Sequence, residues 1–113
     1  MASKMSDPEF EKKLIEYESA EKQLQMVLLQ KQQIQMQLNE INLANEELKK
    51  AKGDVYKSIG SIMVRSTRED AEQDLKEKKE LFELRMNTLN KQDEKLKETL
   101  TAMQKDLQAR MQK

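Results

Sequence analysis

The chain has 113 residues, of which 37% are charged and 36% hydrophobic, and its 21 basic and 21 acidic residues cancel. This balance argues against a nucleic acid or an anionic membrane surface as a partner. The chain has no Cys and no His, which excludes disulfides and removes the commonest general base and the commonest zinc ligand. With 4% aromatic residues, two Gly and one Pro, it favours long helices over a compact core with many turns.

Segments for targeting, membrane insertion or catalysis are not expected. The N-terminus lacks the apolar run of a signal peptide, and no apolar stretch approaches the length of a membrane span. The chain also lacks a Gly-rich phosphate loop, and two packed helices offer no cleft that would shift the pKa of a carboxylate. We therefore expect a cytoplasmic protein that is not an enzyme, with no catalytic residues, metal site or cofactor.

The first predicted helix covers residues 7–52. Pro8 suits a first turn, Ser6 and Glu9 have the spacing of a capping box, and no Gly or Pro follows until Gly53. A heptad repeat runs through this helix and argues against disorder, because nine of the twelve positions at a and d are apolar. The a positions are Phe10, Tyr17, Leu24, Lys31, Leu38 and Asn45, and the d positions are Lys13, Ala20, Val27, Ile34, Ile41 and Leu48.

A single β-hairpin is predicted over residues 53–66. Residues 55–59 and 62–65 are rich in β-branched and aromatic side chains, and Gly60-Ser61 between them suits a type II′ turn with a positive φ at Gly60. This turn places Ile59 opposite Ile62, and the same register pairs Lys57 with Val64 and Tyr56 with Arg65.

The second predicted helix covers residues 67–112 and starts at a capping box formed by Ser66 and Glu69. Eight of its eleven seam positions are apolar. The d positions are Leu75, Phe82, Leu89, Leu96, Met103 and Arg110, and the a positions are Lys79, Met86, Asp93, Leu100 and Leu107.

The two heptad patterns mesh if the second helix folds back along the first. Facing residues then have numbers that sum to about 120, so every a position meets a d position. Lys31 and Asp93 fall in adjacent layers, and we predict that they pair across the seam. The fold class is mainly α: residues 1–113 form a single domain, a long antiparallel two-helix coiled coil with one β-hairpin between the helices. A parallel intermolecular dimer is the alternative, but it leaves the hairpin and the matched helix lengths unexplained.

The hairpin is predicted to be an assembly surface. Two strands alone are marginally stable, and their outer edges are unpaired. Apolar side chains lie on both faces, so a single pair of helices cannot cover them, and pairing with hairpins of other chains into an intersubunit β-barrel follows. The alternative, without a role in assembly, is a helix–helix loop that happens to contain β-branched residues. The proposed assembly residues are Val55, Tyr56, Ile59, Ile62, Met63 and Val64.

Apolar residues near the two chain ends form a candidate surface for binding apolar segments, and the methionines suit it because their side chains adapt to many shapes. These residues are Phe10, Leu14, Ile15, Tyr17, Leu100, Met103, Leu107 and Met111. The alternative is that they close the end of the coil, which is favoured for Tyr17, Leu100 and Met103. An outer stripe at f of the first helix has the same two interpretations, a binding surface or a drift in register, and contains Ile15, Leu29, Met36 and Leu43.

The segment Asp54 to Arg65, with its V-Y-K-x-x-G core between two long helices, resembles the prefoldin beta class, especially its archaeal members. One hairpin fits here, whereas alpha-class subunits carry two. The resemblance implies a hetero-hexamer of two alpha and four beta subunits, with the hairpins in a double β-barrel and the coiled coils as tentacles. It also implies that unfolded client proteins are held at the tips and passed to a group II chaperonin without ATP hydrolysis.

Two other functions compete with that of a holding chaperone. A structural or tethering coiled coil without client binding remains the alternative, although it needs neither the hairpin nor apolar ends. A nucleic-acid-binding zipper needs a basic region that runs into the heptads, and this sequence has none.

Overall fold

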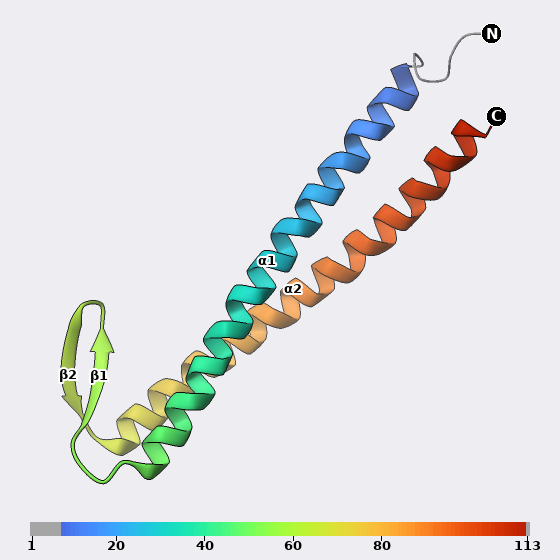
Figure 1. Cartoon of the computed structure of the whole chain (residues 1–113). Coiled ribbons are helices and arrows are strands. Elements are labelled where there is room, and N and C mark those ends of the chain that lie inside the picture. The colour runs from blue at the N-terminus through green and yellow to red at the C-terminus, as the bar shows by residue number, and fades with distance from the viewer. Residues whose placement is uncertain (1–7, 113) are drawn as a thin grey trace. The chain divides into compact units, whose positions relative to one another are not determined.

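A computed structural model describes residues 8–112 and confirms the predicted fold class of two long helices with one β-hairpin between them (Figure 1). Helix α1 spans Pro8–Lys50, strand β1 Val55–Ile59, strand β2 Ile62–Ser66 and helix α2 Arg68–Met111. The first helix therefore ends two residues before the predicted boundary at residue 52. The chain divides into two compact units, which we call the free-end unit (Met1–Lys31 and Thr88–Lys113) and the hairpin unit (Gln32–Asn87).

The heptad positions mark the buried stripe of both helices. All twelve seam positions predicted in α1 and all eleven predicted in α2 are buried or partly buried. In contrast, Leu29 and Met36 at position f are exposed. The apolar period of the sequence thus identifies which side of each helix is packed.

In the free-end unit the two helical segments run in opposite directions. Glu9 pairs with Arg110, Lys13 with Asp106 and Lys31 with Asp93, so residue numbers rise along α1 as they fall along α2. Lys31 Nζ and Asp93 Oδ2 lie 2.8 Å apart, which confirms the predicted pair. The first turn of α1 and the last turn of α2 therefore share one end of this unit.

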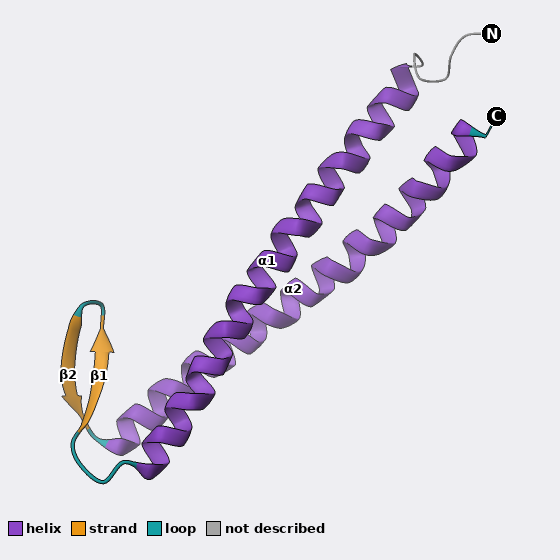
Figure 2. Ribbon diagram, in the orientation of Figure 1, coloured by secondary structure: helices purple, strands orange, loops and turns teal. Residues whose placement is uncertain are grey.

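The strands of the hairpin unit pair in the predicted register (Figure 2). Ile59 faces Ile62, Lys57 faces Val64 and Tyr56 faces Arg65. Gly60 has φ of 59°, and among the described residues no other residue has a positive φ. A positive φ at the first loop residue alone is the pattern of a type II′ turn, which matches the twist of the flanking strands.

The capping residue of α2 differs from the prediction. Thr67, not Ser66, accepts a hydrogen bond from the backbone N–H of Asp70, with a distance of 3.1 Å. Ser66 is the last residue of β2 and pairs with Val55, so the N-cap moves one residue further along the chain. The predicted capping box at Ser6 lies outside the described residues.

The ends of the two helices in the hairpin unit are held by one side chain. The guanidinium of Arg68, the first residue of α2, donates a hydrogen bond to the carbonyl oxygen of Ala51, just beyond α1. Carbonyl groups at a helix C-terminus lack intrahelical partners, and a basic side chain is a favourable donor to them. Arg68 therefore ties the point where α1 ends to the point where α2 begins.

Candidate assembly and client-binding surfaces

The hairpin presents apolar side chains on both faces. Paired residues of an antiparallel ribbon share a face, so the register puts Val55, Ile59, Ile62 and Val64 on one side, and Tyr56 and Met63 on the other. Five of these six candidate assembly residues are between 41% and 64% exposed, and only Val55 is partly buried. The described sheet has two strands, so each also has an unpaired edge.

The helices of the hairpin unit cover only the base of the ribbon. The partly buried strand residues are Val55, Lys57 and Ser66, which share one face near the helix ends. An ion pair of 2.8 Å between Arg65 and Asp54 closes the same end of the ribbon. The half of the ribbon nearest the turn is consequently left without cover from its own chain.

A groove missed by the sequence analysis lies between β1 and the helix ends of this unit. Small side chains leave it open, and its lining includes Ala44, Ala51 and Ala71. In the sequence, the alanines beside the seam at the hairpin end are the signal for this groove, because a small side chain there allows the backbone of a neighbouring segment to come close. The groove is continuous with the base of β1 through Val55 and Tyr56.

The eight candidate client-binding residues of the free-end unit fall into three groups. Phe10 and Leu107 are buried, with exposed fractions of 7% and 8%. Tyr17, Leu100 and Met103 are partly buried at seam positions, as expected of residues that close the coil. Leu14, Ile15 and Met111 are exposed, by 39%, 65% and 65%. Only the last group offers apolar surface directly.

Four charged side chains, which we call the free-end charge cluster, surround this end of the seam. Lys13 Nζ lies 2.9 Å from Asp106 Oδ2, and Arg110 Nη2 lies 3.2 Å from Glu9 Oε1. Arg110 Nε also approaches Asp106 Oδ2 at 3.4 Å. The hydrogen bond from Lys13 is the main reason why the pKa of Asp106 lies below its usual value, although burial opposes it.

The sequence contains a signal for this cluster. The predicted register placed Arg110 opposite Phe10 and Lys13 opposite Leu107, which puts two cations at apolar seam positions. Cations in such positions require acidic neighbours, and Glu9 and Asp106 supply them.

A second charged layer lies deeper in the free-end unit. Asp93 is only 5% exposed and has two cationic partners: Lys31 across the seam, and Lys97 one turn away on α2 at 3.0 Å. Hydrogen bonds from Lys31 and then Lys97 lower the pKa of Asp93, outweighing the opposing effect of burial. The carboxylate is thus charged at neutral pH and bridges the two helices.

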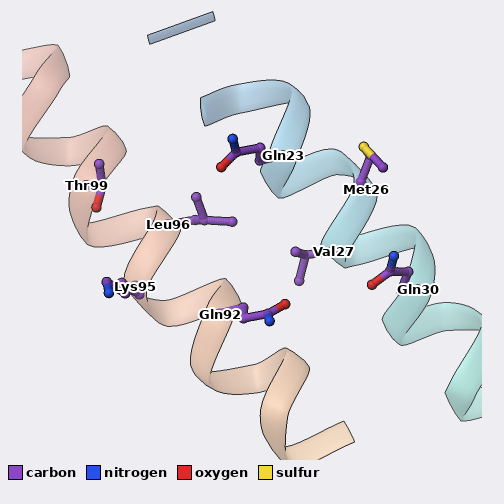
Figure 3. Close-up of a pocket in the computed structure, with 8 residues that line it drawn as sticks. All are labelled: Gln23, Met26, Val27, Gln30, Gln92, Lys95, Leu96 and Thr99. Atoms are coloured by element: carbon purple, nitrogen blue, oxygen red, sulfur yellow. The ribbon is translucent and has the colours of Figure 1, made fainter. Parts of the chain in front are cut away.

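Beside this layer, Val27 and Leu96 point towards each other across the seam, with a shallow groove around them (Figure 3). The groove is flanked by the amide side chains of Gln23, Gln30 and Gln92. Both apolar and hydrogen-bonding groups are therefore present at this surface.

Other classes of site find no support in the part of the chain that the structure describes. Residues 8–112 contain no group of three or more acidic side chains arranged to hold a metal ion. Within the same residues, neither helix has an apolar stretch long enough to span a bilayer.

Comparison with protein families matches residues 11–113 to the family described as prefoldin subunit. The chain is 40% identical over 104 residues to the prefoldin subunit beta of Pyrococcus furiosus, covering 90% of this chain and 89% of that protein. The prefoldin subunit beta of Archaeoglobus fulgidus is 37% identical over 103 residues, covering 89% of each chain.

A solved structure has the same fold. The crystal structure of the prefoldin beta subunit from Thermococcus strain KS-1 is similar with a TM-score of 0.85 and 35% sequence identity. The similarity covers 94% of this chain and 95% of that one. The family match over residues 11–113 includes the whole hairpin and helix α2, and all of helix α1 except its first three residues.

Proposed function

The chain belongs to the prefoldin family of chaperone subunits and matches its beta class, and on that basis we propose that it holds unfolded proteins without nucleotide. In this proposal two alpha-class and four beta-class subunits assemble in the cytoplasm through their hairpins. The free-end units bind the client, which is then delivered to a group II chaperonin. The subunit contributes binding surface and performs no catalytic step.

The exposed hairpin is the observation that carries the assembly part of the proposal. Ile59, Ile62 and Met63 are each at least 60% exposed. An isolated two-stranded ribbon is marginal in water, and unpaired edges with apolar faces favour strand addition. Pairing with hairpins of other subunits into a barrel covers both faces and both edges at once.

The free-end unit supports client holding in a different way. Leu14, Ile15 and Met111 present apolar surface near one end of the unit. Apolar side chains of varied shape, including a flexible Met, suit clients that share hydrophobicity and little else. Binding of this kind requires no nucleotide, because affinity comes from burial of apolar area.

The test replaces all three exposed residues with Ser in a complex assembled with an alpha-class prefoldin subunit. We expect about tenfold weaker binding of chemically unfolded citrate synthase, because a few apolar side chains supply most of such an affinity. Light scattering measures suppression of aggregation without nucleotide, and solution mass confirms an unchanged assembly.

The matched control replaces Leu81 and Leu84 with Ser, removing exposed apolar area from α2 of the hairpin unit. It should retain holding activity. Full holding by the first variant contradicts the assignment of clients to the free end. A wild-type assembly that fails to hold any client contradicts the chaperone mechanism and favours a structural role.

A further inference from the structure

The free-end charge cluster bonds the first two turns of α1 to the last two turns of α2. Two of its ion pairs cross between the helices, from Lys13 to Asp106 and from Arg110 to Glu9. Asp106 is the central residue, since it accepts from both Lys13 and Arg110. Removing this single carboxylate therefore disconnects both cations from a shared partner.

The cluster surrounds apolar side chains that the closed end keeps out of reach. Phe10 follows Glu9 in the chain, Leu107 follows Asp106, and both are more than nine-tenths buried. The neighbouring apolar residues Leu14 and Met111 are exposed beside them. If the helix ends separate, Phe10 and Leu107 join an apolar surface that is already present.

The bonds that keep this end closed are of a kind that breaks readily. The side chains of Lys13, Asp106 and Arg110 are 35%, 45% and 29% exposed, so water and salt reach them. Ion pairs at this exposure are weak and are screened by salt. Helix ends are also where local opening is least costly. In contrast, the carboxylate of Asp93 is 7% exposed and fixes the deeper layer.

We propose that the free-end charge cluster is a clasp that regulates client binding: closed, it keeps Phe10 and Leu107 buried, and open, it adds them to the client-binding surface. This inference rests on the proposed holding function and specifies how the same surface is regulated. The clasp opens as ionic strength rises or when an ionised client segment takes over one of its charges.

The first experiment measures opening without any client. The chain has no Cys, so Leu107→Cys provides a single thiol whose labelling rate reports exposure of that position. In the assembled complex we expect Asp106→Asn to speed labelling of this thiol about threefold, because only weak ion pairs are removed. Raised salt should speed labelling of the parent thiol in the same direction, with a smaller effect in the Asp106→Asn background.

The second experiment measures holding of unfolded citrate synthase by the complex in which position 107 is again Leu. Asp106→Asn should lower the Kd about threefold at low salt, matching the gain in opening. The control is Asp74→Asn, which removes an ion pair to Lys78 within one helix of the hairpin unit and bridges no helices. It should leave both the labelling rate and the Kd unchanged.

Unchanged labelling in Asp106→Asn overturns the clasp. So does faster labelling with an unchanged Kd, since opening then has no consequence for binding. If the wild-type complex holds no client, the holding function itself fails, while the labelling result still decides whether the cluster controls opening. Should Asp106→Asn fail to fold, Arg110→Gln removes one cross-helix pair and carries the same expectations.

Discussion

Within the hairpin unit, apolar residues at the seam of the helices are buried or partly buried, and most of those in the β-hairpin are exposed. Along the helices, Ile34, Ile41 and Leu48 are each at most 8% exposed. In the hairpin, Ile59 and Ile62 are 60% and 64% exposed, although they are the same residue type as two of the buried ones. The residue type therefore does not decide whether an isoleucine is buried.

The difference lies in what each element can cover within its own chain. A helix has one apolar stripe, and a second helix folded back beside it buries that stripe. A two-stranded ribbon has two faces and two edges, and the helix ends reach only its base at Val55 and Lys57. The seam is thus completed within one chain, whereas the outer half of the ribbon is left exposed by the described residues of its own chain.

The largest effect is expected from disabling the ribbon while preserving its pairing. Ile59→Asp with Ile62→Lys replaces a facing apolar pair by opposite charges, which remain compatible across an antiparallel ribbon. We expect this variant to stay helical and to lose assembly with an alpha-class subunit, because the outer half of the ribbon becomes polar. Light scattering gives the mass, and circular dichroism gives the helix content.

The matched control for this variant is Met36→Asp with Leu43→Lys. These side chains are as exposed as the two isoleucines but lie on α1 of the same unit. The control should assemble normally. Normal assembly by the ribbon variant would show that exposure of Ile59 and Ile62 has no role in subunit contacts.

A smaller effect is expected in the seam. Ile34→Ala removes buried apolar volume and should lower the free energy of unfolding by about 2–5 kcal/mol. Met36→Ala, two residues along the same helix at a site that is 63% exposed, should change it by no more than about 0.5 kcal/mol. Urea denaturation followed by circular dichroism measures both, and equal losses would refute the distinction between the seam and the outer face.

The seam and the ribbon were predictable because both depend on local periodicity. Apolar residues at heptad spacing identify the packed side of a helix, and the spacing of Ile59 and Ile62 around Gly60 sets the strand register. The fold-back register gave the pair of Lys31 and Asp93, since opposite charges in adjacent seam layers lie within reach of each other. Exposure on both faces of the ribbon was predictable because both faces carry apolar side chains, and a single pair of helices cannot cover both.

The features that escaped prediction depend on competition between equivalent local choices. Ser66 and Thr67 are both good N-caps, and the last rung of the strand ladder decides between them by using Ser66. The free-end charge cluster depends on the side-chain directions of Arg110 and Lys13, which spacing alone does not give. The identity of the partner subunits is not predictable from this sequence alone, because an unpaired strand edge favours pairing with another chain and does not specify which one.

The smallest effect is expected from the charged layer around Asp93, where the sign is the informative quantity. Lys31→Leu leaves the 7% exposed side chain of Asp93 with only Lys97 and should lower the melting temperature, by less than Ile34→Ala does. Lys31→Leu combined with Asp93→Leu should restore or raise it, because apolar residues often replace a buried ion pair without loss. A double variant less stable than the single one would show that this ion pair is a net source of stability.

Because of the charged layer around Asp93, the stability of the wild type should depend on pH differently from that of the double variant Lys31→Leu with Asp93→Leu. The pKa of Asp93 is lowered from its ordinary value of 3.8, so its charged form stabilises the fold above that pH. As the pH falls through the lowered pKa, the proton neutralises Asp93 and this contribution is lost. The stability of the wild type, compared with that of the double variant, should therefore fall below pH 3.8, as thermal unfolding across a pH series would measure. If the difference in stability between the two proteins stayed constant across the pH series, the bonds of Asp93 to Lys31 and Lys97 would not favour its charged form. The charge of Asp93 would then not stabilise the packing of the helices.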